Sequence, residues 1–151
     1  MSTIVVLDTG PLGMLTNPAG SQRNTDCRQW VERLLLRGDS VAVPEIADYE
    51  VRRELLRANK VEGLARLNTL RAHPAFMYLP LATAAMDRAA EFWALARREH
   101  RPTASDSALD ADVILAAQAA LLADDGHEVV VATTNVAHLT RFARAALWTD
   151  L

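Results

Sequence analysis

Cysteine, a signal peptide and long apolar runs are scarce or missing in this chain of 151 residues. Its only cysteine, Cys27, excludes an internal disulfide and favours a reducing compartment. The N-terminus lacks the basic start of a signal peptide, and the longest later apolar run, residues 113–123, falls well short of the ~20 residues that span a membrane. We therefore expect a cytoplasmic protein without a membrane segment.

Lysine is also nearly absent, since Lys60 is the only lysine among 16 basic residues. No glycine closely precedes Lys60, so a glycine-rich phosphate-binding loop is excluded. The net charge of −3 gives no overall attraction to nucleic acid, so any surface that binds nucleic acid has to be local. The predominance of arginine fits either a biased genome composition or bidentate contacts to phosphate or carboxylate groups.

What the chain does contain is the pattern of a folded α/β domain. Half of its residues are apolar, and short β-branched runs alternate with longer stretches of helical periodicity. We expect strands at 4–7, 41–44, 76–81, 128–135 and 146–148, and helices at about 25–37, 45–58, 60–72, 83–98 and 111–125. This alternation predicts a single α/β domain over residues 1–151, with a central parallel sheet of four to five strands flanked by helices.

Capping residues and periodicity predict details of these elements. Thr83 and Asp110 stand where they would cap the helices that follow them, and the polar stretches at 16–24 and 100–110 are expected to be loops. Pro80 indicates an edge strand or a strand end. The helix that begins near Thr83 is expected to bury an apolar face of Met86, Ala89, Ala90 and Trp93.

Oxygen-bearing side chains recur where strands end or the next helix begins. The stretch "IVVLDTGPL" ends a strand on Asp8, Glu50 lies on the helix after the second strand, and Asn135 follows the fourth strand. Asp112 lies at the start of the apolar helix that precedes that fourth strand. Sites in parallel α/β sheets form beyond the carboxyl ends of the strands, and hard cations such as magnesium prefer oxygen ligands. These residues therefore indicate a metal site.

Each residue also has a purely structural interpretation. Asp8 and Asn135 fit turn or loop positions, and Glu50 fits a solvated helix acid paired with Arg53. Asp112 fits a first-turn acid favoured by the helix dipole. However, Asp112 immediately precedes "VILAA", and an unpaired carboxylate in so apolar a helix is costly unless a cation offsets its charge.

The blocks "IVVLDTGPL", "VAVPEIADYEVRREL", "DADVILAAQA" and "VVVATTNVAHLTRF" resemble, in order and spacing, the motifs of PIN-domain nucleases. The resemblance runs from Ile4 to about Phe142 and is strongest to the VapC-type toxins of toxin–antitoxin pairs. It implies a PIN-like domain that hydrolyses RNA phosphodiester bonds with magnesium or manganese (Mg2+ or Mn2+). It further implies a homodimer and neutralisation by a small antitoxin.

The resemblance also implies roles for particular residues. Asp8, Glu50 and Asp112 match the metal-binding acids, although Glu54 is a second choice for Glu50. Asn135 matches a fourth position that is often Asp in the family. Because an amide carries no charge, a second metal site built on this position is expected to be weaker. Apart from the resemblance, Thr9 and Thr133 are candidates for orienting a ligand acid or a phosphate oxygen, unless they simply cap or end strands, and Asp110 is a third supporting candidate. The residues expected to contact RNA or antitoxin, if they are not simply a solvated helix face, are Arg52, Arg53 and Arg57.

Two other functions fit parts of the sequence. A catalytically weak PIN-like module that binds RNA or protein is compatible with Asn135, because an amide brings no charge to a metal. An aspartyl-phosphate phosphotransferase built on Asp8 is disfavoured, because that chemistry requires a second Asp where Gly10 stands.

Overall fold

The computed structural model describes residues 2–99 and 106–151. In this part of the chain, five parallel strands form one sheet in the order β3-β2-β1-β4-β5. The strands are β1 (Thr3–Leu7), β2 (Ser40–Pro44), β3 (Phe76–Leu79), β4 (Glu128–Thr133) and β5 (Ala145–Leu147). The predicted α/β fold with a central parallel sheet is therefore confirmed, and β3 lies at the edge, as Pro80 indicated.

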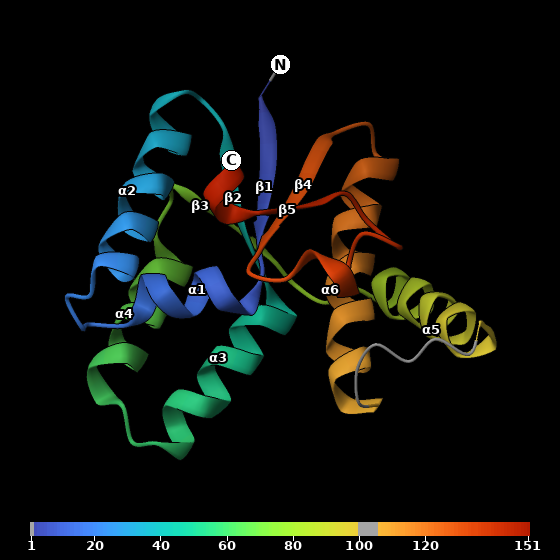
Figure 1. Cartoon of the computed structure of the whole chain (residues 1–151), viewed down its shortest axis with the longest axis horizontal. Coiled ribbons are helices and arrows are strands. Elements are labelled where there is room, and N and C mark those ends of the chain that lie inside the picture. The colour runs from blue at the N-terminus through green and yellow to red at the C-terminus, as the bar shows by residue number, and fades with distance from the viewer. Residues whose placement is uncertain (1, 100–105) are drawn as a thin grey trace.

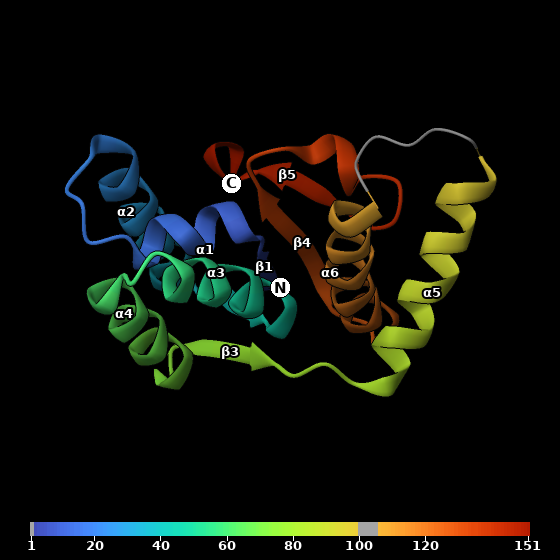
Figure 2. The ribbon, with the colours of Figure 1, turned by 90° about the horizontal axis from the view of Figure 1, so that it is seen from below.

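The helices cover both faces of this sheet (Figure 1). They are α1 (Thr9–Thr16), α2 (Gln22–Leu36), α3 (Glu45–Arg57), α4 (Val61–Ala72), α5 (Thr83–Arg98) and α6 (Asp106–Asp124), with the short 3-10 helices η1 (Val136–His138) and η2 (Trp148–Asp150). Figure 2 shows α1 to α4 gathered on one side, with α5 and α6 side by side on the other. None of the helices in the described residues is long and apolar enough to span a membrane.

Strand β1 lies in the middle of the sheet and is buried on both faces. Val5 and Leu7 pack into the core formed with α1 and α2, whereas Ile4 and Val6 pack into the core formed with α6. Successive strand residues point to opposite faces, so a β-branched run of this kind fits a strand covered on both sides. The same arrangement brings the carboxyl ends of β1 and β4 next to each other, which positions the candidate site.

Helix α1 follows β1 directly, although the sequence pattern does not predict it. Gly10, Pro11 and Gly13 are poor helix formers, but proline is tolerated in the first turn, where no intrahelical partner for its nitrogen is needed. Asp8 caps the helix through its side chain. The next helix, α2, begins at Gln22, earlier than predicted, because the side chain of Ser21 caps it.

The start of α6 also differs from the prediction. The helix begins at Asp106, so Asp110 lies inside it and is not its N-cap. Leu109 is buried against Ala89 and Ala96 of α5, and this packing extends the helix into the predicted loop 100–110. Residues 100–105 of that predicted loop lie outside the described residues.

The predicted apolar face of α5 is partly wrong. Thr83 is the first helical residue, and Ala82 occupies the cap position without a side-chain hydrogen bond. Ala89 is buried, whereas Ala90 is exposed and Met86 and Trp93 are 45% and 38% exposed. Small alanines let α5 approach α6 closely, so the large side chains remain at the edge of the contact.

Candidate active site at the carboxyl edge of the sheet

Asp8 is held by both of its carboxylate oxygens. Its Oδ1 accepts a hydrogen bond from the backbone N–H of Thr9 at 2.7 Å, and its Oδ2 accepts one from the hydroxyl of Thr133 at 2.7 Å. Thr133 is the last residue of β4, the neighbour of β1, and is fully buried. The carboxylate is thus fixed at the junction of two strands and one helix.

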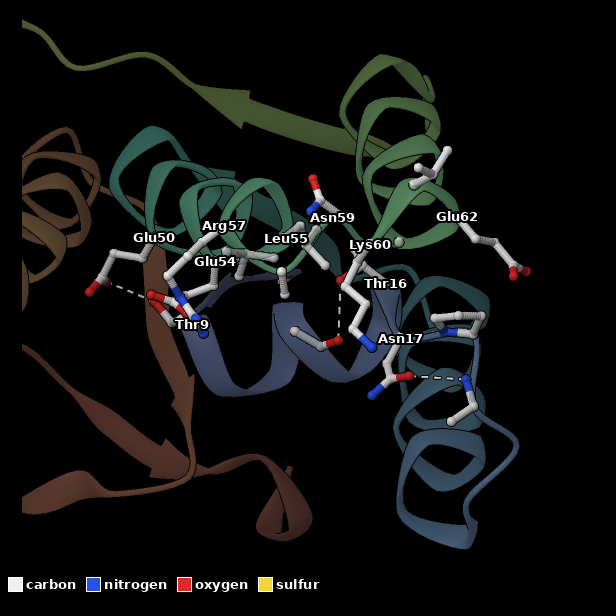
Figure 3. A pocket seen from close by; sticks show the side chains of 17 residues that line it. Thr9, Thr16, Asn17, Glu50, Glu54, Leu55, Arg57, Asn59, Lys60 and Glu62 are labelled. Carbon is white, nitrogen blue, oxygen red and sulfur yellow. Dashed lines mark hydrogen bonds and ion pairs between the residues drawn. The ribbon is translucent and has the colours of Figure 1, made fainter.

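Glu50 reaches the same place from α3. The hydroxyl of Thr9 donates a hydrogen bond to Glu50 Oε1 at 2.8 Å (Figure 3). An Arg53 nitrogen lies 3.7 Å from Glu50 Oε2. Thr9 therefore contacts two acids, Asp8 through its backbone nitrogen and Glu50 through its side chain. This geometry sets Glu50 apart from Glu54, which pairs with Arg57 at 2.8 Å and is exposed.

Asp112 brings a third carboxylate from α6. Burial raises the pKa of Asp112 from 3.8 to about 6; nearby His138 opposes the shift, and the negative charges of Asp8 and Glu50 add to it. The Nδ1 atom of His138 lies 4.0 Å from Asp112 Oδ2. Three acids from separate elements thus repel one another across a partly buried site.

Asn135 lies beside these acids as the cap of η1. Its Oδ1 accepts from the N–H of Ala137 at 3.1 Å, and its own N–H donates to the Thr133 hydroxyl at 3.1 Å. The sequence analysis did not select His138. The only feature of the sequence that could have indicated His138 is its position, three residues after Asn135 in the short segment that follows β4.

The donor set fits a hard divalent cation. Carboxylate oxygens are the ligands that Mg2+ and Mn2+ prefer. Burial raises the pKa of Asp112, the charges of Asp8 and Glu50 add to the shift, and a bound cation would offset both effects. Among residues 2–99 and 106–151, however, no three His, Cys, Asp or Glu side chains are grouped closely enough to hold a metal as they stand. Asp8 and Glu50 point instead to threonine hydroxyls.

A groove of about 910 Å³ extends from Glu50 between α1 and the α3–α4 pair. Thr9 and Glu50 line one end, and Lys60 lines it farther along, as Figure 3 shows. Of the three arginines predicted to contact RNA or antitoxin, Arg57 lines this groove.

The other two arginines have partners within the protein. Arg52 donates to both oxygens of the buried Asp48, at 2.9 and 3.1 Å, and to Asn68 at 2.7 Å. Arg53 lies over the ring of Tyr49, with 5.1 Å between the guanidinium carbon and the ring centre. Asp110 lies elsewhere, in a second groove between α5 and α6.

Comparison with known families now identifies the domain. The family model of the PIN domain matches residues 5–144. This chain belongs to the PIN domain family. The resemblance predicted from the four sequence blocks is confirmed, and the acids described above lie within the matched region of the PIN domain.

Solved structures agree with this PIN fold. The FitAcB structure from Neisseria gonorrhoeae is similar at 20% identity and a TM-score of 0.70, covering 97% of this chain and 99% of that one. VapBC2 from Rickettsia felis, bound to a promoter DNA fragment, is 14% identical with a TM-score of 0.70 and covers 96% and 98%. VapC20 from Mycobacterium tuberculosis, a toxin that cleaves the sarcin–ricin loop, is 15% identical with a TM-score of 0.63 and covers 91% and 94%. No curated protein matches the sequence significantly.

Proposed function

We propose that this PIN-domain protein is a metal-dependent endoribonuclease that hydrolyses RNA phosphodiester bonds. The observation that carries the proposal is the convergence of Asp8, Glu50 and Asp112, with the pKa of Asp112 raised to about 6 by burial and by the other two acids. Strongly shifted carboxylates in a partly buried site are typical of catalytic centres. The similarity to VapC20, described as a toxin that cleaves the sarcin–ricin loop, supports the same chemistry.

Asp8, Glu50 and Asp112 would hold Mg2+ or Mn2+ after their side chains turn toward it, with Asn135 as a neutral neighbour. When bound, such an ion lowers the pKa of a coordinated water and offsets negative charge on the phosphoryl oxygens. The chain's own contribution is positional: the hydroxyls of Thr9 and Thr133 fix Glu50 and Asp8 at 2.8 and 2.7 Å.

We also propose an antitoxin partner, a homodimer and a cytoplasmic location. Similar folds occur in the VapBC and FitAB structures, which supports a toxin–antitoxin pair. Within the region 45–72, Leu56 and Val61 are 56% and 79% exposed, which supports a contact between copies of the chain.

A second candidate is a catalytically weak PIN module that binds RNA or protein. It is favoured by Asn135, whose side-chain oxygen is already used as a helix cap and adds no charge. Tight binding of RNA without cleavage at any metal concentration would support this candidate over the nuclease.

The decisive experiment is cleavage of a mixed RNA substrate by the purified protein with added magnesium or manganese. We expect cleavage that excess EDTA abolishes. Asp112→Asn should remove it, while Asp125→Asn, which changes an exposed acid just beyond the far end of the same helix, should not. Undiminished cleavage in excess chelator would contradict the metal mechanism.

A further inference from the structure

A second groove, separate from the one beside the acids, lies between α5 and α6. Figure 2 shows these two helices side by side, on the opposite side of the sheet from α1 and α2. The groove has a volume of about 380 Å³. It is lined by Met86, Ala89, Ala90, Trp93, Asp110, Val113 and Ile114. Its lining is therefore apolar apart from one carboxylate, a composition typical of small-molecule sites in which one polar group orients the ligand.

Trp93 gives this groove an aromatic surface that solvent can reach. Its exposed fraction is 38%, against 1% for Trp30 and 6% for Trp148. The Arg97 guanidinium lies 5.2 Å from the centre of the Trp93 ring, within range of a cation–π contact. An exposed indole beside an arginine is the kind of surface on which unpaired nucleobases stack, with each base worth about 1–3 kcal/mol.

Asp110 gives the groove a hydrogen-bond acceptor with no partner. Its side chain is exposed, and within the part of the chain that the structure describes it makes no hydrogen bond or ion pair. An ionised carboxylate only accepts hydrogen bonds, and its two oxygens suit two adjacent donors. Among RNA bases, guanine presents such a pair, N1–H beside the N2 amino group, whereas adenine, cytosine and uracil present no two adjacent donors on that edge.

Helix α6 connects this groove to the catalytic acids. Asp110 and Asp112 are two residues apart, so they leave nearly opposite sides of a helix that is about 10–12 Å across. Asp112 lies among the acids and Asp110 lines the groove. The groove and the acids thus lie on opposite sides of α6, about one helix diameter apart.

We propose that the α5–α6 groove is a nucleobase subsite that takes an unpaired guanine of the RNA substrate. The base stacks on Trp93, and Asp110 accepts hydrogen bonds from its N1–H and N2 amino groups. This inference rests on the proposed ribonuclease function and deepens it, because the subsite selects where the strand is cut. A protein partner in the same groove is the alternative that the test has to reject.

The test uses the fluorescence of Trp93, since Trp30 and Trp148 are buried. Hexauridylate with guanosine, inosine or adenosine at one position is titrated into the full chain in excess EDTA, which prevents cleavage. We expect quenching of the exposed tryptophan, with guanosine binding about tenfold tighter than adenosine, on the scale of a bidentate base contact. Inosine, which lacks the N2 amino group, should fall between the two.

Three variants sharpen the result. Asp110→Asn should remove the preference for guanosine, Asp87→Asn on the exposed surface of α5 should retain it, and Trp93→Phe should abolish the quenching. Thermal melts that match the unaltered protein would show that each variant is folded. Equal affinity for the three oligonucleotides, or an unchanged preference in Asp110→Asn, would overturn the proposal.

Failure of the subsite is distinguishable from failure of the nuclease. Asp8→Asn should lose cleavage in magnesium yet keep the guanosine preference measured in EDTA. Absence of cleavage together with a guanosine preference would remove the nuclease and leave the subsite. Protection of Trp93 from acrylamide that rises with protein concentration, without any effect of RNA, would assign the groove to a contact between copies and overturn the proposal.

Discussion

The two sides of the candidate active site are held in different ways. On the side of α1 and α3, Asp8 and Glu50 are fixed by hydroxyl groups at 2.7 and 2.8 Å. On the side of α6, the Nδ1 atom of His138 lies 4.0 Å from Asp112 Oδ2. Burial raises the pKa of Asp112 to about 6, and the negative charges of Asp8 and Glu50 add to this shift. One half of the site is pre-arranged, and the other half depends on an added positive charge.

The largest expected effect is on cleavage, and it tests whether both halves are needed. Asp112→Asn and Asp8→Asn should each lower the rate of RNA cleavage by at least about a hundredfold, because each removes a negative charge that holds the cation. Single-turnover rates in saturating magnesium are the measurement. A variant that retained the normal rate would show that its carboxylate is not a metal ligand.

The same two variants should change the free energy of unfolding in opposite directions, which distinguishes the α6 side of the site from the α1 and α3 side. Without metal at pH 7, Asp112→Asn should raise the free energy of unfolding by about 1–3 kcal/mol, because it removes a charge whose pKa is raised to about 6. Asp8→Asn should lower it by about 1 kcal/mol, because the charged helix cap and the Thr133 hydrogen bond are weakened. Urea unfolding in EDTA gives both values, and changes of equal sign would contradict this division.

The pH dependence sharpens the comparison further. In the folded state Asp112 takes up a proton near pH 6, above the value of 3.8 for the unfolded chain. The folded state therefore binds more protons between these values, so this group stabilises the fold progressively as pH falls from about 7 to 4. We expect the advantage of Asp112→Asn over the unaltered protein to shrink across this window. An advantage that stayed constant from pH 7 to 4 would show that Asp112 has an ordinary pKa.

The strands of the sheet and the candidate acids could be predicted from the sequence, whereas helix α1 and the hydrogen bonds that hold the acids could not. The strands around Val5 and Val41 are recognisable because β-branched runs buried on both faces have few other interpretations. Helix α1 was missed because glycine and proline hide it, and only the Asp8 cap marks its start. The hydrogen bond from Thr133 to Asp8 joins residues 125 positions apart, so no local pattern contains it.

The smallest effect concerns Asn135, at the boundary between the two halves. Its side chain caps η1 through a 3.1 Å hydrogen bond from Ala137, and it brings no charge. A second cation beside the first, roughly 4 Å away in a two-metal arrangement, would therefore feel repulsion with little compensation. We expect one well-occupied metal in the unaltered protein, and Asn135→Asp should tighten a second site severalfold. Asn135→Ala should lower the free energy of unfolding by about 1 kcal/mol, because the helix cap is lost. It should lower the rate of RNA cleavage much less than Asp112→Asn does.

Calorimetric titration with manganese decides the role of Asn135. The unaltered protein should bind one equivalent tightly, and Asn135→Asp should show a second equivalent at lower metal concentration than before. Asp125→Asn serves as the control for a changed surface charge, and its binding curve should match that of the unaltered protein. Two equally tight sites in the unaltered protein, or identical curves for Asn135→Asp, would show that the neutral amide does not limit the second metal.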